Sequence, residues 1–347
     1  MFSSTSPTAL VSSYISDGTS IFTPVSLSLP SLKDFDILVE VHAVSINPVD
    51  IKMRSRSTKR GRNILLGYDS AGVVVDKGFS VSRFNIGDKV FYSGQINRPG
   101  TYASHHIVNE KLVGHMPSTI PFISASSFPL VSLTAWELLF DCFKLDPIVN
   151  KNSNLLVIGG AGGVSSMVIQ FAKRIFNMNV VATSSRDKTS DWVYRLGADH
   201  VINHRQNLKA QLAEINFAPK FVACLNHASF HFSNILEFVE PFAHIGVIDG
   251  TVDTTLDLFK QKSLSLSSEY VFAKSLYGTS SMIDQGIFLD QLSSYIDASM
   301  ISPIVGHTFP NMSPQNLESA HALQSSGSAI GKTVLGPLIT SEVNPLN

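Results

Sequence analysis

The sequence contains few cysteines, no early basic residues and no uninterrupted apolar run long enough to cross a membrane. Its two cysteines, Cys142 and Cys224, lie far apart in apolar surroundings, so we expect neither a disulfide nor a metal site from them. No lysine or arginine precedes Lys33, which argues against a signal or transit peptide. Prolines and serines interrupt the most apolar stretch, residues 120–140. We therefore expect a cytoplasmic protein that does not enter a membrane.

Excess charge is also absent. The 347 residues carry a formal net charge of −1, which gives no support for a nucleic-acid partner or an acidic membrane surface. One local exception is residues 52–62, which hold six lysines and arginines and no acid. We expect a solvated loop there, with a positive rim that attracts an anionic cofactor or substrate as the alternative. The length suggests two domains or one large one, with a sizeable core.

A glycine-rich stretch at residues 154–173 organises the rest of the chain. An apolar run of strand length enters the glycines, and an amphipathic helical pattern follows them. This order is typical of a dinucleotide-binding turn. We expect Gly160 to allow the tight turn, Gly162 to let a pyrophosphate approach the backbone, and the helix N-terminus to face the phosphates. Ser165 replaces the usual third glycine, so a plain glycine-rich loop is the alternative.

The fold class predicted from the pattern along the chain is α/β. Short strands and frequent turns up to about residue 117 indicate a small β-rich domain. Strands then alternate with helices, which indicates right-handed crossovers and a parallel sheet. After residue 303 the chain again resembles its first part. We therefore predict a doubly wound domain over residues 125–303, nested between two pieces of the β-rich domain, 1–124 and 304–347.

The end of the second strand of the parallel sheet indicates which dinucleotide binds. An NAD-binding protein commonly has an acid there, whereas this strand ends with Ser184, Ser185 and Arg186. Hydroxyls and a guanidinium suit the 2′-phosphate of NADPH, which would repel a carboxylate. Asp187 fits better as the start of the next helix. We predict NADPH, and the alternative for Arg186 is a surface charge at a helix start.

Seven motifs in register resemble the medium-chain dehydrogenase/reductase superfamily, and within it the zinc-free quinone oxidoreductase branch and the subgroup often labelled "zinc-type alcohol dehydrogenase-like". The resemblance covers about residues 37–338. The motifs are SINPVD at 45–50, GYDSAG at 67–72, GDKV at 87–90, LTAWE at 133–137, the glycine turn, LGADHVI at 196–202, and GK at 331–332 with the strand after it.

The resemblance implies a GroES-like β-barrel catalytic domain with an inserted Rossmann domain and a cofactor cleft between them. It also implies a homodimer. Relatives of this kind place the nicotinamide, the pyrophosphate and the 2′-phosphate along the inserted domain, with a tyrosine in many of them where this chain has His204. The implied cofactor contacts are Thr134, Gly160, Gly162, Gly163, Val164, Ser184, Ser185, Arg186, Lys188, His204, Asn226, Ile248, Gly250 and Lys332.

The zinc-dependent relatives bind catalytic zinc through Cys, His and Cys. The matching positions here are Asn47 and Tyr68, with Asp69 after it, and no cysteine lies near them. The loop that holds structural zinc in those relatives is short here, at residues 91–100, and contains no cysteine. We therefore predict that the protein binds no metal.

Without a metal to polarise an alcohol, the sequence favours reduction of an electrophilic acceptor. We expect hydride transfer from NADPH to a small-molecule quinone or α,β-unsaturated carbonyl. Asn47, Lys52 and Tyr68 are the candidates to stabilise the charge on the carbonyl oxygen. Each also has a structural interpretation: a turn cap, a solvated side chain and a core residue, respectively. The alternatives for the whole chain are an aldehyde or alcohol dehydrogenase and a non-catalytic NADPH-binding sensor.

Overall fold

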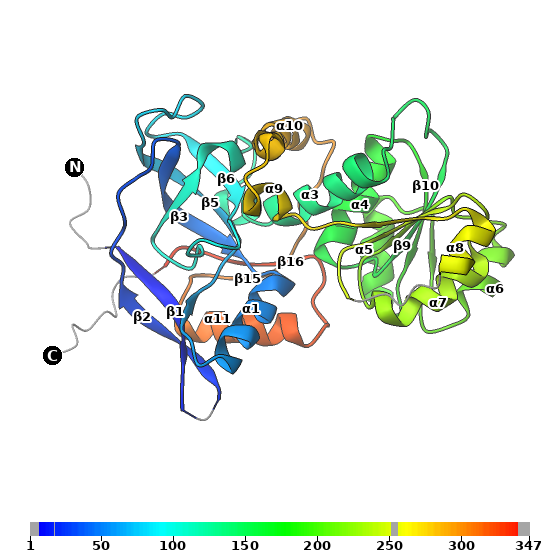
Figure 1. The fold of residues 1–347 in the computed structure, drawn as a ribbon, viewed down its shortest axis with the longest axis horizontal. Helices are drawn as coiled ribbons and strands as arrows, with labels where there is room; N and C mark the ends of the chain where they lie inside the picture. Colours follow the sequence, from blue (N-terminus) through cyan, green and yellow to red (C-terminus); the bar gives the residue numbers. More distant parts are fainter. Residues whose placement is uncertain (1–6, 17, 251–255, 339–347) are drawn as a thin grey trace. The chain divides into compact units, whose positions relative to one another are not determined.

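The computed structural model describes residues 7–16, 18–250 and 256–338. The chain divides into two compact units (Figure 1). The β-rich unit consists of residues 1–130 and 272–347, and the inserted unit consists of residues 131–271. An insertion of one unit into the other agrees with the predicted organisation.

Two sheets form the β-rich unit. A three-stranded sheet has the order β2-β1-β4, and a seven-stranded sheet has the order β15-β16-β3-β5-β6-β8, with β7 paired to β3. The long strand β3 lies at the centre, and its inward side chains Ile37, Val39 and Val41 are buried. The strands are β1 (Thr8–Tyr14), β2 (Ser20–Ser26), β3 (Asp36–Ser45), β4 (Ile64–Leu65), β5 (Asp69–Lys77), β6 (Lys89–Ser93), β7 (His105–Asn109), β8 (Val113–His115), β15 (Val305–Phe309) and β16 (Lys332–Leu335).

The basic stretch after β3 is a helix, α1 (Pro48–Lys59), so the predicted loop over residues 52–62 is wrong for most of its length. Pro48 occupies the first turn, where its missing N–H costs nothing. The Asp50 carboxylate accepts the Asn47 N–H at 2.9 Å, which satisfies a donor at the helix start. Arg54 then pairs with Glu318 at 2.7 Å, so part of the positive charge is neutralised within the unit.

Residues 272–303 belong to the β-rich unit and not, as predicted, to the inserted one. This segment contains α9 (Ala273–Leu276) and α10 (Ile283–Asp297). Arg83 donates to Asp290 on α10 at 2.6 Å. At the end of α10, Asp297 accepts hydrogen bonds from the backbone and hydroxyl groups of Ser118 and Thr119. These bonds join residues far apart in sequence, so helical periodicity alone could not assign α10 to the β-rich unit.

The inserted unit is a parallel six-stranded sheet with the order β11-β10-β9-β12-β13-β14. The alternation of strands and helices predicted for this part of the chain is observed. The strands are β9 (Asn154–Ile158), β10 (Asn179–Thr183), β11 (His200–Ile202), β12 (Phe221–Cys224), β13 (His244–Val247) and β14 (Ser265–Ser268). The chain leaves β9 toward β10 and β11 and then returns to the other side of β9, which is the doubly wound order.

Helices connect these strands (Figure 1). The chain moves from β9 to β11 through α4 and α5, and it moves in the opposite direction along the sheet, from β11 to β13, through α6 and α7. Because all these crossovers are right-handed, α4 and α5 lie on one face of the sheet and α6 and α7 on the other. The helices are α4 (Gly163–Arg174), α5 (Asp187–Leu196), α6 (Leu208–Glu214), α7 (Ala228–Phe238) and α8 (Leu256–Lys262). One apolar cluster of this unit includes Leu156, Val222 and Ile245 from the sheet and Leu208 and Phe232 from α6 and α7.

One helical run, Phe122–Cys142, would be long and apolar enough to span a membrane if length and composition alone decided. It comprises α2 (Phe122–Ala125), α3 (Pro129–Trp136) and a π-helical turn at Glu137–Cys142. Its most apolar window is 78% buried inside the protein. Such burial is typical of a core helix in a water-soluble fold.

The remaining helix, α11 (Pro314–Ser325), was predicted from residue 314 to about residue 325. Ser313 caps it by accepting the Asn316 N–H at 3.2 Å. The helix lies beside α1 and β2. Glu318 on α11 is therefore placed beside α1 and the β1–β2 hairpin, where it pairs with Arg54.

Candidate functional site

The inserted unit has one topological switch point, at the carboxyl end of β9. The neighbours of β9 are β10 on one side and β12 on the other, and the chain reverses its direction of winding between them. Doubly wound sheets bind ligands outside the carboxyl ends of the strands at this point. The glycine turn of residues 159–163 follows β9, and Asn226 follows β12. The glycine turn and Asn226 therefore lie at the end of the sheet where such a fold binds a dinucleotide.

Two glycines in this turn are required by its geometry. Gly159 has φ = +90°, a left-handed conformation that favours glycine. Gly160 has an ordinary φ, but a Cβ there would lie 2.8 Å from the carbonyl oxygen of Thr183. The tight turn predicted for Gly160 is therefore made by Gly159, while Gly160 allows the close approach to the end of β10. Gly159 is a residue that the sequence analysis did not single out.

Gly162 is different, because a Cβ there would meet only Gly159 O at 3.6 Å and Ser165 Oγ at 3.7 Å. It is the N-cap of α4, which begins at Gly163. The first N–H groups of a helix have no partner within that helix and carry its positive dipole end. Gly162, Gly163 and Val164 thus form a small cradle without large side chains, and the cradle suits a pyrophosphate.

Ser165, in place of the third glycine, is accommodated inside the turn. Its side chain is buried, and its hydroxyl donates to the Gly159 carbonyl at 2.5 Å. Its neighbour Ser166 donates to the Gly162 carbonyl at 2.7 Å and accepts the Trp192 indole N–H at 2.9 Å. Both serines therefore brace the turn and link α4 to α5.

The end of β10 presents positive charge. Arg186 and Lys188 are exposed, and Ser185 is half-buried. Ser184 is buried, and its hydroxyl lies 2.5 Å from Thr189 Oγ1 and 3.3 Å from the Arg186 carbonyl. The first three can thus reach a ligand, whereas the Ser184 hydroxyl already has partners at the start of α5.

Of the remaining predicted contacts, Asn226, His204, Ile248 and Gly250 follow the carboxyl ends of strands of the same sheet, and Thr134 lies on a helix. Thr134 is a buried residue of α3, Asn226 is exposed after β12, and Ile248 is half-buried after β13. Gly250 has φ = +85°. His204 is half-buried in the turn after β11. Their roles in cofactor binding stay predictions.

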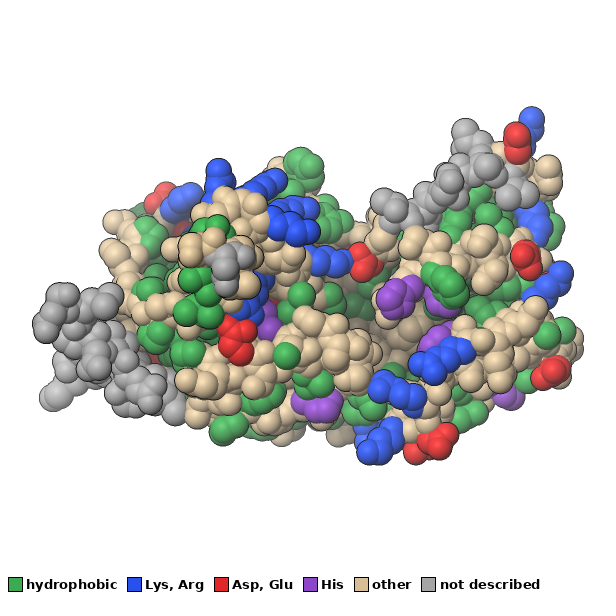
Figure 2. All heavy atoms as spheres, turned by 90° about the horizontal axis from the view of Figure 1, so that it is seen from below, with side chains coloured by type: hydrophobic (Ala, Val, Ile, Leu, Met, Phe, Trp, Pro, Cys, Tyr) green, Lys and Arg blue, Asp and Glu red, His purple; other side chains and the backbone are tan. Residues whose placement is uncertain are grey.

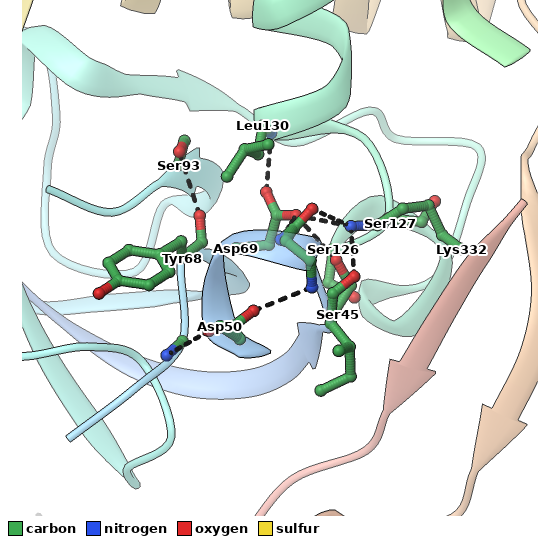
Figure 3. A network of polar contacts seen from close by, with 12 residues as sticks. Ser45, Asp50, Tyr68, Asp69, Ser93, Ser126, Ser127, Leu130 and Lys332 are labelled. Carbon is green, nitrogen blue, oxygen red and sulfur yellow. Dashed lines mark hydrogen bonds and ion pairs between the residues drawn. The ribbon is translucent and has the colours of Figure 1, made fainter. Parts of the chain in front are cut away.

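A buried polar cluster occupies the β-rich unit beside the end of β3 (Figure 3). Asp69 is fully buried, and one of its carboxylate oxygens accepts from Ser45 at 2.8 Å, from Asn47 at 2.7 Å and from Lys332 at 3.1 Å. Its other oxygen accepts the Leu130 N–H at 2.7 Å. Four donors from three segments of the chain therefore hold this carboxylate.

Lys332, on β16, is almost fully buried. Its ammonium donates to the Ile46 carbonyl at 2.8 Å, to Asp69 and to the Asn47 side-chain oxygen. Burial lowers the pKa of Lys332, and the negative charge of Asp69 opposes that shift. An ammonium has three N–H donors. All three are used here, so this geometry does not favour the prediction that Lys332 contacts the cofactor.

The three predicted catalytic residues differ in what their side chains can do. Asn47 is fully buried, and its amide donates to Asp69 and accepts from Lys332. Tyr68 is buried with its ring edge against Phe272, at 5.4 Å between ring centroids. Lys52 is exposed on α1. Asn47 is thus a structural partner of Asp69 and Lys332 and the N-cap residue of α1, and the catalytic roles of the three residues stay predictions.

The residues at the zinc-ligand positions do not fit a zinc ion. Tetrahedral zinc sites use cysteine, histidine and carboxylate ligands that converge on one point. Here the carboxylate of Asp69 is taken by four hydrogen-bond donors, and the positive charge beside it is the Lys332 ammonium. In the described parts of the chain, no three His, Cys, Asp or Glu side chains are grouped to hold a metal.

Asp50 is the residue of this cluster that we expect to make stability depend on pH. Its carboxylate accepts the N–H groups of Asn47 and Gly67, both at 2.9 Å. Burial outweighs these bonds and raises the pKa of Asp50 to about 7. Between pH 4 and pH 7 the folded protein therefore binds more protons than the unfolded chain. Linkage then requires the free energy of unfolding to fall as pH rises through this window.

The test is urea denaturation of the wild type and of Asp50→Asn at several pH values between 4.5 and 8. We expect the wild type to lose on the order of 1.4 kcal/mol for each unit by which the pKa is raised. Asp50→Asn is expected to be less stable overall, because an amide offers one acceptor where the carboxylate offers two. Its stability should vary less with pH. Equal pH dependence in both proteins would contradict the assignment to Asp50.

Ser45, Asp50 and Asp69 of this cluster were not selected from the sequence as site residues. One local signal was available for Asp50, because an acid three residues after Asn47, with Pro48 between them, is a helix-start pattern. For Ser45 and Asp69 no local signal existed. Ser45 and Asp69 are hydrogen-bonded but lie 24 residues apart in sequence, and Asp69 and Lys332 lie 263 residues apart.

A β-rich unit with an inserted dinucleotide-binding sheet defines a class of nicotinamide-dependent oxidoreductases. Residues 33–118 match the alcohol dehydrogenase GroES-like domain, and residues 163–287 match the zinc-binding dehydrogenase family. The chain is 36% identical over 309 residues to the zinc-type alcohol dehydrogenase-like protein SACOL2177 of Staphylococcus aureus (strain COL), covering 88% of this chain and 92% of that protein. The chain belongs to the medium-chain dehydrogenase/reductase superfamily, among its zinc-type alcohol dehydrogenase-like proteins.

Solved structures agree with this assignment. A Rhizobium etli CFN 42 protein assigned to the zinc-dependent alcohol dehydrogenases is 36% identical, with a TM-score of 0.87 over 95% of this chain and 98% of that one. Quinone oxidoreductase of Escherichia coli, solved with NADPH, is 20% identical, with a TM-score of 0.77 over 95% and 100% of the two chains. The second likeness shows the fold alone. The predicted superfamily and the GroES-like and Rossmann folds are confirmed, and the protein is an NAD(P)H-dependent oxidoreductase.

Proposed function

We propose that this protein is an NADPH-dependent reductase that transfers hydride, without a metal, to a quinone or to the β-carbon of an α,β-unsaturated carbonyl. The observation that carries the proposal is the cluster of Lys332, Asp69 and Asn47. Asn47 stands at a position where the zinc-dependent members of the superfamily have a zinc ligand, and its amide is engaged with the Asp69 carboxylate and the Lys332 ammonium. The three N–H donors of the Lys332 ammonium are all engaged within the cluster, which leaves none to polarise an alcohol, so reduction of an already electrophilic acceptor is favoured.

The choice of NADPH is supported by the ends of β9 and β10. When bound, the nicotinamide would supply the hydride. The cradle of Gly162, Gly163 and Val164 would hold the pyrophosphate at the start of α4. Arg186 and Lys188 would hold the 2′-phosphate, because both are exposed and the three residues that follow β10, Ser184, Ser185 and Arg186, include no acid. The NADPH complex of the E. coli quinone oxidoreductase is consistent with this choice.

Reduction places negative charge on the carbonyl oxygen of the acceptor, and donors aimed at that oxygen would stabilise it. Because both ends of the Asn47 amide are engaged with Asp69 and Lys332, we propose Tyr68 and Lys52 for this role. A phenol could also deliver the final proton. A Tyr68→Phe variant that kept full turnover would remove this tyrosine from the mechanism.

The assay that tests the function is oxidation of NADPH, with NADH in parallel, against 1,4-benzoquinones and enones, with and without a chelator. We expect turnover that prefers NADPH and resists the chelator. Activity that needs an added metal would overturn the metal-free proposal and favour an aldehyde or alcohol dehydrogenase. Binding of NADPH without turnover of any acceptor would favour a sensor.

We also propose a homodimer, in which β14 of one copy lies beside β14 of another. β14 is the edge strand of the six-stranded sheet, and Leu266 on it is partly exposed. An edge strand has unused backbone donors and acceptors that a second strand can pair with. Light scattering after size exclusion would measure the mass. A monomer at micromolar concentration would contradict the proposal.

A further inference from the structure

Three histidines come together at the carboxyl edge of the inserted sheet. His204 lies in the turn after β11, and His227 and His231 lie at the start of α7, which follows β12. His227 is the N-cap of α7, in a left-handed conformation with φ = +49°, and His231 is one turn further on. The rings of His204 and His231 are 6.3 Å apart and nearly perpendicular. Figure 2 shows histidines (purple) grouped near lysine and arginine side chains (blue) on the face it presents.

This histidine cluster adjoins the proposed phosphate-binding end of β10. The Ser184 N–H donates to the Ile202 carbonyl at 2.9 Å, so β10 and β11 end side by side. Arg186 lies two residues after Ser184, and His204 lies two residues after Ile202. Arg186 lies close enough to His204 for its charge to disfavour protonation of the imidazole. The cluster and the arginine therefore face the same small region.

Two ring nitrogens of this cluster have no hydrogen-bond partner among the described residues. His231 is 5% exposed, and its Nδ1 is buried with no hydrogen-bond partner among the described residues. His204 Nδ1 is in the same situation within the described chain. Unpartnered buried nitrogens cost free energy unless a ligand or water satisfies them. An anion with several acceptor oxygens would satisfy them at the least cost.

We propose that His204, His227 and His231 form, together with Arg186, a proton-coupled site for the 2′-phosphate of NADPH, so that the preference for NADPH over NADH strengthens as pH falls. This inference rests on the proposed use of NADPH. It adds a specificity device that the end of β10 alone does not supply. NADH lacks the phosphate and therefore serves as the built-in control.

The sign of the effect follows from the charges that face each ring. Burial lowers the pKa of His204, and Arg205, His227 and Arg186 lower it further. Burial also lowers the pKa of His231, together with His204 and His227. A bound phosphate would raise the pKa of these imidazoles, because an opposite charge favours the charged form. Binding then takes up protons, and affinity for NADPH decreases as pH rises. Below about pH 6 the phosphate itself loses charge, which limits the effect.

The experiment measures dissociation constants of NADPH and NADH by fluorescence titration from pH 6 to pH 8. Calorimetry in two buffers of different ionisation enthalpy would count the protons taken up. We expect the ratio of the NADH to the NADPH dissociation constant to fall by about thirtyfold from pH 6.5 to pH 8, as for uptake of one proton, which is tenfold for each pH unit. The fragments 2′,5′-ADP and 5′-AMP should reproduce the difference without the nicotinamide.

Two variants and one control assign the effect to the cluster. His204→Gln and His231→Gln should flatten the pH dependence of the ratio and reduce proton uptake. His204 is half-exposed, so its variant keeps the test valid if His231→Gln does not fold. His200→Gln is the matched control, because His200 is an exposed residue at the opposite end of the same short strand, β11.

The outcomes separate this inference from the function on which it rests. A preference for NADPH that does not change with pH, or one that His204→Gln leaves unaltered, would overturn the histidine site and leave the NADPH-dependent function standing. Failure of NADPH to bind at any pH would overturn the proposed function and the site together.

Discussion

Replacing Lys332 with methionine is expected to lower the free energy of unfolding by about 3–5 kcal/mol. The substitution removes the only ammonium that contacts Asp69 in the described structure, and leaves a fully buried carboxylate without its counter-charge. It also removes the donor to the Ile46 carbonyl and to the Asn47 amide. Urea denaturation, followed by far-UV circular dichroism, would measure the loss.

Two further variants make this result specific to the ion pair. The double variant Asp69→Asn, Lys332→Met is expected to recover part of the loss, because it removes the uncompensated charge. Lys262→Met is the matched control, since the Lys262 ammonium donates only to the neutral carbonyls of Leu236 and Val239 and should cost about 1 kcal/mol. A loss from Lys332→Met no larger than that from Lys262→Met would contradict the account.

Alanine at two neighbouring glycines is expected to separate folding from cofactor binding. Gly160→Ala should destabilise the protein by about 1–3 kcal/mol, because its Cβ would lie 2.8 Å from the backbone oxygen of Thr183. Gly162→Ala should change stability by less than about 0.5 kcal/mol, since its Cβ makes only ordinary contacts. The same methyl group would stand where the pyrophosphate approaches, so NADPH should bind at least about tenfold more weakly.

Thermal unfolding without cofactor and fluorescence titration with NADPH measure the two effects. The pair provides its own control, because each variant adds one methyl group to the same turn. If Gly162→Ala bound NADPH as tightly as the wild type, the cradle at the start of α4 would not be the pyrophosphate site. A Gly160→Ala protein of unchanged stability would mean that the turn can move away from β10 at little cost.

Local patterns were sufficient to predict much of this protein. The apolar run before Gly159 and the helical pattern after Ser165 correctly predicted β9 and α4. The start predicted at Asp187 is that of α5, Asp187–Leu196, and Gly197 has a left-handed conformation at its end. These features depend on side-chain spacing and on the freedom of glycine, both of which are properties of short segments.

Other features depend on contacts between distant segments. The basic stretch after β3 was predicted as a loop, but Arg54 meets Glu318 and the ring of Phe22, and these contacts stabilise α1. The segment that forms α10 was predicted to lie in the doubly wound domain, residues 125–303, but it belongs to the β-rich unit. That depends on Arg83 and Asp290, which lie 207 residues apart.

The candidate site shows the same division. By itself, the sequence determined the superfamily, the α/β fold, the glycine turn and the hydroxyl-rich, basic end of β10, because each is written in consecutive residues. Only the tertiary structure decided that Asn47 and Lys332 are structural partners of Asp69 and that three histidines adjoin Arg186. Hydrogen bonds and burial join residues from separate strands and helices, and the free energy of a buried charge is set by those neighbours and not by its place in the sequence.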